Sequence, residues 1–359
     1  MTRRMLKFIA YLIVALLVSV QWRGNARSAP RHAAPACEPA SLDPADPCWA
    51  TLKSLYRPLG PPPFPEDNPF TPVKYELGRK LFFETLLSGS RTRSCATCHN
   101  PSLSWGDGLP RATGDKMDKL ALRAPTLIDI AWLSIMGWDG KFPGLEEVTF
   151  IPILGRSNMD LDEATAKARI SAVPGYVDLF TAAFGDGEVT RERIEQAIAT
   201  FERTIVSAPA PFDDWIAGDQ AAIGDAAKRG FVVFNGQGHC AACHSGWAFT
   251  DGSFHDIGSA TGDDIGRGRL FPTSLKLRYA FKVPTLRDAA RRAPFMHDGS
   301  LASLADVIDL YDKGGIDRPS RSPEIKPLNL SSQQRADLLA FLQTLTSPAT
   351  ATEVPVLPR

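Results

Sequence analysis

The sequence predicts a mainly α-helical protein built from two similar units in tandem, with long ordered loops. Apolar residues recur at helical spacing in residues 71–87, 190–206, 226–234 and 331–345, and little of the chain shows the alternation of a strand. The chain has 359 residues, of which 28 are glycine and 29 are proline, and this composition favours short helices separated by loops. A five-residue motif and a longer segment both occur twice, and these repeats predict the two units.

The first residues have the features of an export signal. Three basic residues precede an apolar run at 8–20, and small residues follow at Ala26 and Ser28. The run is shorter than the roughly 20 residues of a membrane-spanning helix. A cleaved signal peptide at 1–28 is therefore predicted, with an uncleaved anchor as the alternative.

The overall charge excludes two classes of partner. Forty basic and forty acidic side chains give no net charge, so there is no electrostatic argument for nucleic acid or for a membrane surface once the signal is removed. Export places the cysteines in an oxidising compartment, where Cys37 and Cys48 are predicted to form a disulfide. The other four cysteines follow a more specific pattern.

Two copies of the motif C-x-x-C-H stand at residues 95–99 and 240–244. This is the attachment motif of c-type haem, in which two thiols one helical turn apart bond to one porphyrin and the adjacent histidine ligates the iron. A redox dithiol or half of a zinc site is the alternative, but no further Cys or His pairs complete a zinc site. Two covalently bound haems are predicted, attached at Cys95, Cys98, Cys240 and Cys243 and ligated by His99 and His244.

The repeat extends beyond the motifs. Segments 125–148 and 284–307 align without gaps, and nine of their 24 columns are identical. The halves are therefore two copies of one haem-binding unit, whose columns can be compared. Trp138 stands opposite His297 in this alignment.

Four columns after the aligned block, Pro152 stands opposite Tyr311. Tyr311 lies on the apolar face of a predicted helix, where packing in the core is the plain alternative to a functional role. If this column faces iron, the second haem is closed by a phenolate, whereas the first is open because proline has no donor side chain. No histidine occurs between His99 and Pro125 to close the first haem from another direction.

By these features the chain resembles the bacterial di-haem cytochrome c peroxidases and MauG-like proteins. The resemblance covers nearly the whole mature chain and includes SCATCHNP, GWDGKF, AIATFERTIVSAPAPFDDW, GFVVFNGQGHCAACHSGW and KVPTLRDAARRAPFMHDGS. It implies two mainly α-helical, cytochrome c-like haem domains in tandem. The expected ranges are a signal at 1–28, an extension at 29–52, an N-terminal haem domain at 53–207, a C-terminal haem domain at 208–348 and a tail at 349–359.

The resemblance also implies roles for single residues. Ordinary peroxidases of the family place methionine where this chain has Tyr311, and tyrosine is typical of MauG-like members; an anionic oxygen favours ferric and higher oxidation states. Trp138 is expected between the haems as a route for electrons, with a large core aromatic as the alternative. The implied location is the periplasm, and the implied protein substrate is the small-subunit precursor of methylamine dehydrogenase.

The chain departs from the family pattern at several positions. The distal glutamine and glutamate of the peroxidases fall on Val148 and Asn158, so rapid peroxidase turnover is not expected. Glu146 and Glu147 are nearby but are expected on a solvated helix face. An asparagine that helps to bind calcium between the haems falls on Arg123, which leaves a bound calcium open.

The leading hypothesis is a periplasmic di-haem oxidase that uses peroxide equivalents to complete the tryptophan tryptophylquinone of that precursor. The alternative is a di-haem cytochrome c peroxidase, which reduces hydrogen peroxide with electrons from a small redox protein. A non-enzymatic electron carrier is the third hypothesis. The open haem expected at His99 argues against it, because a carrier keeps both axial positions filled.

Overall fold

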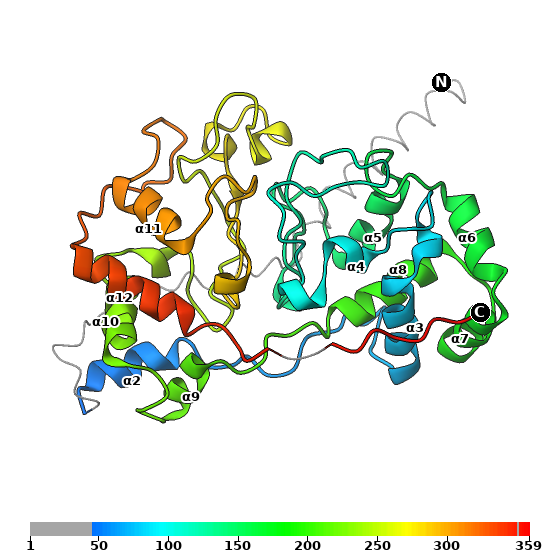
Figure 1. Ribbon diagram of the computed structural model, residues 1–359, viewed down its shortest axis with the longest axis horizontal. Coiled ribbons are helices and arrows are strands. Elements are labelled where there is room, and N and C mark those ends of the chain that lie inside the picture. Colours follow the sequence, from blue (N-terminus) through cyan, green and yellow to red (C-terminus); the bar gives the residue numbers. More distant parts are fainter. Residues whose placement is uncertain (1–44, 350–351) are drawn as a thin grey trace, which may run out of the picture. The chain divides into compact units, whose positions relative to one another are not determined.

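The computed structural model describes residues 45–349 and 352–359, which are mainly helical with long connecting loops (Figure 1). The α-helices are α2 (Pro47–Ser54), α3 (Pro72–Phe83), α4 (Cys95–Cys98), α5 (Leu145–Leu154), α6 (Glu163–Ser171), α7 (Pro174–Phe184), α8 (Arg191–Glu202), α9 (Pro211–Ala217), α10 (Asp225–Asn235), α11 (Leu304–Lys313) and α12 (Ser332–Gln343). Two short strands, β1 (Phe254–His255) and β2 (Phe281–Lys282), pair antiparallel. Single 3-10 turns are η1 (Thr85–Leu87), η2 (Pro101–Leu103), η3 (Ile130–Trp132), η4 (Cys240–Ala242), η5 (Arg267–Arg269), η6 (Leu275–Leu277) and η7 (Ala289–Arg291).

The N-terminal predictions fall mostly outside the described residues. The predicted signal peptide and Cys37 lie there, so the structure does not test them. Cys48 is disulfide-bonded, in line with the predicted bridge, and the four motif cysteines are free thiols. None of the helices in the described residues is long and apolar enough to cross a membrane.

The four helices predicted from periodicity correspond to α3, α8, α10 and α12. Their N-termini follow local chemistry: the side chains of Thr71, Thr190 and Ser331 each accept a hydrogen bond from a backbone N–H of the first turn. Three of the helices end earlier than predicted, α12 by two residues at Gln343. Helix α3 ends at Phe83 because the backbone of the next residue, Glu84, is extended. Helix α8 ends at Glu202, and Arg203 begins the turn that leads to the segment between the two units.

Glycine lets these helices pair closely, and it does so the same way in both units. A Cβ at Gly78 of α3 would lie 1.8 Å from the Ala197 backbone oxygen of α8. A Cβ at Gly230 of α10 would lie 1.9 Å from the Asp337 backbone oxygen of α12. Any larger residue would force each pair apart, so both crossings depend on glycine.

The structure confirms the internal repeat. Helices α5 and α11 occupy the same columns of the sequence alignment. An isolated antiparallel bridge joins Met136 to Phe142 in the first unit, and its counterpart joins Phe295 to Leu301 in the second. The column that holds Pro152 and Tyr311 therefore has the same place in both units.

A buried aspartate–serine contact also repeats. Asp129 accepts hydrogen bonds from the backbone N–H and hydroxyl of Ser207, and Asp288 accepts the same two bonds from Ser347. Both aspartates take a left-handed backbone, with φ of 60° and 55°. The connection that begins at Ser207 is thus fixed to the first unit at its start.

Each unit has its own hydrophobic core. One cluster gathers the buried residues of α3, α5, α7 and α8, and the other those of α10 to α12. Helix α2 belongs to the second cluster, because Trp49 and Tyr56 pack against Phe231. The division at 53–207 and 208–348 stays a prediction, and the packing assigns the segment up to Tyr56 to the C-terminal core.

Candidate functional site

One cavity collects the predicted residues of the second motif. Cys240, Cys243, His244 and Tyr311 all line it, and leucine, isoleucine, valine and phenylalanine side chains form much of the remaining wall. Trp138 of the first unit is also part of the lining. The first motif's cysteines and histidine are not, so the structure keeps the two sets of attachment residues apart.

Both motif histidines are oriented by a backbone carbonyl. His99 Nδ1 lies 3.3 Å from the Trp105 oxygen, and His244 Nδ1 lies 2.8 Å from the Phe249 oxygen. Trp105 and Phe249 both have a left-handed backbone, which is what turns their carbonyls back toward the histidines. Because Nδ1 carries the donated proton, Nε2 of each ring carries the lone pair that can bind a metal. Burial lowers the pKa of both histidines, which favours this neutral form.

The four motif cysteines are half-buried and lie within one turn of their partners. Cys95 and Cys98 are one turn apart on α4, and Cys240 begins the turn η4 that Cys243 ends. Burial raises the pKa of Cys95 and raises that of Cys240 to about 12. Two thiols and a neutral, oriented imidazole at each motif fit a c-type haem.

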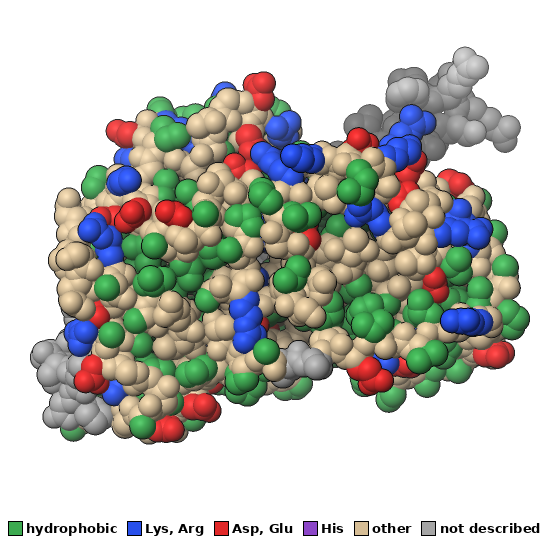
Figure 2. All heavy atoms as spheres, viewed as in Figure 1, with side chains coloured by type: hydrophobic (Ala, Val, Ile, Leu, Met, Phe, Trp, Pro, Cys, Tyr) green, Lys and Arg blue, Asp and Glu red, His purple; other side chains and the backbone are tan. Residues whose placement is uncertain are grey.

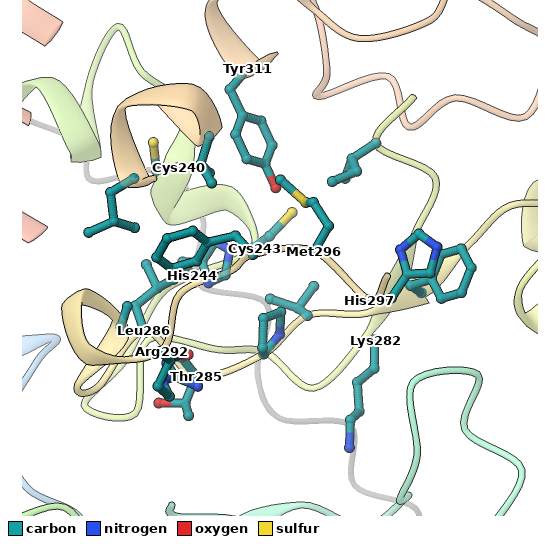
Figure 3. Close-up of a pocket in the computed structure, with 18 of the residues that line it drawn as sticks. Cys240, Cys243, His244, Lys282, Thr285, Leu286, Arg292, Met296, His297 and Tyr311 are labelled. Atoms are coloured by element: carbon teal, nitrogen blue, oxygen red, sulfur yellow. Dashed lines mark hydrogen bonds between the residues drawn. The ribbon is translucent and has the colours of Figure 1, made fainter. Parts of the chain in front are cut away.

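Tyr311 extends from α11 into the cavity, toward the side where Cys243 and Met296 lie (Figure 3). No described residue forms a hydrogen bond with its hydroxyl. Burial raises the pKa of Tyr311, and the nearby Cys243 and Cys240 raise it further. The free phenol is therefore neutral, and ionisation requires a compensating positive charge such as a metal ion.

Met296 is a cavity residue that sequence reasoning missed. It lines the same cavity as Tyr311, and its backbone is left-handed with φ of 69°. Its alignment partner in the first unit is Gly137, so the repeat offered no signal for it. A thioether is the usual ligand of the peroxidases, which makes Met296 the natural internal comparison for Tyr311.

Pro152 lies inside α5, at the place that Tyr311 takes in α11. Its backbone oxygen accepts a hydrogen bond from Met159 N–H (3.0 Å) and so helps to fold back the segment after the helix. The Asp115 carboxylate accepts hydrogen bonds from the backbone N–H and the hydroxyl of Ser90. The side chains at these two positions therefore do not act as ready ligands.

Trp138 joins the two units. Its ring Nε1 donates to the Arg123 backbone oxygen (3.1 Å), and its own backbone oxygen accepts from Lys282 N–H of β2 (2.8 Å). Trp138 and Lys282 both line the cavity. This fixed position fits a residue between two haem sites, although Trp138 has a packing role as well.

His255 and His297 are both held by other side chains. His255 lies between Ser253 and Ser322, and His297 contacts Asp264 (2.8 Å) while stacking on Phe281 at 3.6 Å. Neither side chain is free to displace Tyr311 as a candidate ligand.

The prediction that Glu146 lies on a solvated face is wrong. Its carboxylate forms a bidentate ion pair with Arg203 (2.6 and 2.8 Å) and accepts a hydrogen bond from Asn68. Next to this network, Glu202 is buried with one carboxylate oxygen lacking a partner in the described residues. Burial raises the pKa of Glu202 to about 8, and its charge acts on Cys95.

Comparison with known proteins identifies the family. A model described as di-haem cytochrome c peroxidase matches residues 72–221, and one described as cytochrome c matches residues 227–346. The methylamine utilization protein MauG of Methylorubrum extorquens is 48% identical over 89% of this chain and 91% of its own. The chain belongs to the MauG group of di-haem cytochrome c peroxidases. MauG of Methylophilus methylotrophus is 44% identical, over 82% of this chain and 89% of its own.

Membership of the MauG group agrees with the fold and the site. A solved MauG-like protein associated with microbial copper homeostasis superposes with a TM-score of 0.73 at 29% identity, covering 81% of this chain and 93% of that one. The chain is a haem-dependent oxidoreductase with two tandem cytochrome c-type domains and two c-type haems. The predicted fold class and enzyme class are confirmed.

Proposed function

We propose that this MauG-type protein completes the tryptophan tryptophylquinone of the methylamine dehydrogenase precursor, using peroxide equivalents as oxidant. The observation that carries the proposal is Tyr311, which enters the same cavity as His244 at the column where ordinary peroxidases place methionine. Two relatives of 48% and 44% identity are named methylamine utilization proteins, which points to the same pathway.

The residues at the two C-x-x-C-H motifs give the two haem sites different roles in this proposal. At both motifs the cysteines would hold the porphyrin covalently and the oriented histidine would bind its iron, which assigns Cys95, Cys98 and His99 to one haem and Cys240, Cys243 and His244 to the other. When bound, the haems supply peroxide reduction and one-electron oxidation. Pro152 offers no side-chain donor to the first site and would leave it open to the oxidant, whereas Tyr311 would supply a phenolate oxygen to the second and favour its more oxidised states.

Trp138 couples the two sites in this proposal. Its hydrogen bonds to both units hold the indole in a fixed orientation at the edge of the cavity. A rigid aromatic placed between two redox centres shortens the distance that an electron must cross. The substrate tryptophans would then be oxidised at the protein surface, with no need to enter the cavity.

The proposed setting is the periplasm, reached through the signal at 1–28. The proposed partner is the small-subunit precursor, and a small redox protein is the electron donor only in the alternative. On the face drawn in Figure 2, basic and acidic side chains are interspersed. Docking on that face would therefore depend on local shape and paired charges and not on a field of one sign.

The test is a direct comparison of two reactions. Purified holoprotein is mixed with the methylamine dehydrogenase precursor and hydrogen peroxide, and quinone absorbance and precursor mass are followed. We expect quinone to form, and oxidation of a reduced small cytochrome by peroxide to be slow. Fast cytochrome oxidation with an unmodified precursor would instead support the peroxidase alternative.

A further inference from the structure

Two arginines from different units meet beside Trp138. Arg123 donates through Nη2 to the Arg292 backbone oxygen (2.9 Å), and Arg292 donates through Nη2 to the Thr285 backbone oxygen (2.6 Å). The Arg123 backbone oxygen accepts a hydrogen bond from the Trp138 indole N–H, and the Arg123 backbone N–H donates to the His297 backbone oxygen. Both arginines line the cavity, so these backbone contacts fix two guanidinium groups at its wall.

Neither guanidinium forms an ion pair in the described residues, although the charge of Asp107 acts on Arg123. In the described residues, Nε of each is buried without a hydrogen-bond partner, and no acidic side chain lies within ion-pair distance of either group. Arg123 is only 8% exposed. Burial and, less strongly, the charge of Arg123 lower the pKa of Arg292 to about 10, while the charges of Asp288 and Asp129 act in the opposite direction. A buried cation that lacks an ion-pair partner and keeps an unpaired N–H is costly, so this arrangement favours an anion in the cavity.

We propose that Arg123 and Arg292 bind haem propionate carboxylates and supply the positive charge that the family resemblance assigns to calcium. A guanidinium pairs with a carboxylate through charge-assisted hydrogen bonds. Calcium needs about six to eight oxygen ligands, and Arg123 replaces an asparagine oxygen with a cation that repels the metal. Calcium therefore does not fit this chain at that position. The inference goes beyond the proposed function, since it holds for any substrate.

Chelation of the holoprotein tests the first half of the proposal. We expect purified protein to contain less than stoichiometric calcium, and its optical and EPR spectra to be unchanged by EGTA or by added calcium. Stoichiometric calcium, or a spectrum lost on chelation and restored by calcium, would overturn the proposal.

Substitution tests the second half. Arg123→Gln should lower the reduction potential of at least one haem, because a positive charge beside the oxidised iron is removed. Arg123→Lys should keep the potential near that of the parent, and Arg291→Gln, at an exposed neighbour, is the matched control. Parent potentials in Arg123→Gln would contradict the proposal. If Arg123→Gln fails to incorporate haem, the reduction potentials of Arg292→Gln and the chelation result test the proposal in its place: a lowered potential supports it, and parent potentials contradict it.

Discussion

Replacing Tyr311 with phenylalanine separates a ligand from a core residue. No described residue hydrogen-bonds to the hydroxyl, so its removal leaves no protein group unsatisfied. The free energy of unfolding should then change by less than about 1 kcal/mol. If Tyr311 is the sixth ligand, substrate oxidation should fall at least about 100-fold, which corresponds to about 2.7 kcal/mol in the activation barrier. A small change in stability with a large loss of activity is the signature of the ligand.

The assay combines spectroscopy with turnover. Tyr311→Phe should retain both haems by mass, lose the parent low-spin EPR signal and fail to form quinone in the precursor. Met296→Leu, at the other candidate donor of the cavity, is the control and should keep the parent spectrum. The reasoning is refuted if Tyr311→Phe keeps the low-spin signal and activity, or if Met296→Leu is the variant that loses them.

Three further substitutions give independent checks. Cys95→Ala combined with Cys98→Ala should yield a chain that carries one haem by denaturing mass spectrometry, and two retained haems would exclude attachment at these thiols. The folded-state pKa of Glu202 is raised to about 8 from 4.5, so the folded protein holds a proton that the unfolded chain loses, and stability should fall as pH rises between about 4.5 and 8. Glu202→Gln should reduce this pH dependence of the free energy of unfolding by up to about 1.4 kcal/mol per pH unit, measured by denaturation at several pH values. The control Glu192→Gln, at an exposed position, should leave the pH dependence unchanged. Trp138→Phe should keep both spin states but slow quinone formation in single-turnover measurements; parent rates would show that Trp138 only packs.

Local patterns in the sequence were sufficient for much of the fold and site. The spacing of each C-x-x-C-H motif already fixes which atoms can attach and ligate a haem. The ungapped repeat predicted that Pro152 and Tyr311 occupy equivalent places, and α5 with α11 confirms this. Both inferences depend on residues close together in the chain or on a direct copy of it.

Contacts between distant segments were beyond such patterns. Glu146 pairs with Arg203, 57 positions away, and with Asn68, 78 positions away, and nothing local indicated either partner. The packing of α2 against the C-terminal core brings the first described helix to the last unit of the chain. Met296 enters the cavity because of its left-handed backbone, a conformation that side-chain periodicity does not report.

The most direct test of the account is EPR of the resting, oxidised holoprotein. The structure places a donor, Tyr311, in the cavity of His244 and a proline at the matching column of the His99 unit. We therefore predict one high-spin and one low-spin ferric centre in equal amounts. Two low-spin centres with no high-spin signal would contradict the division into one open and one closed site.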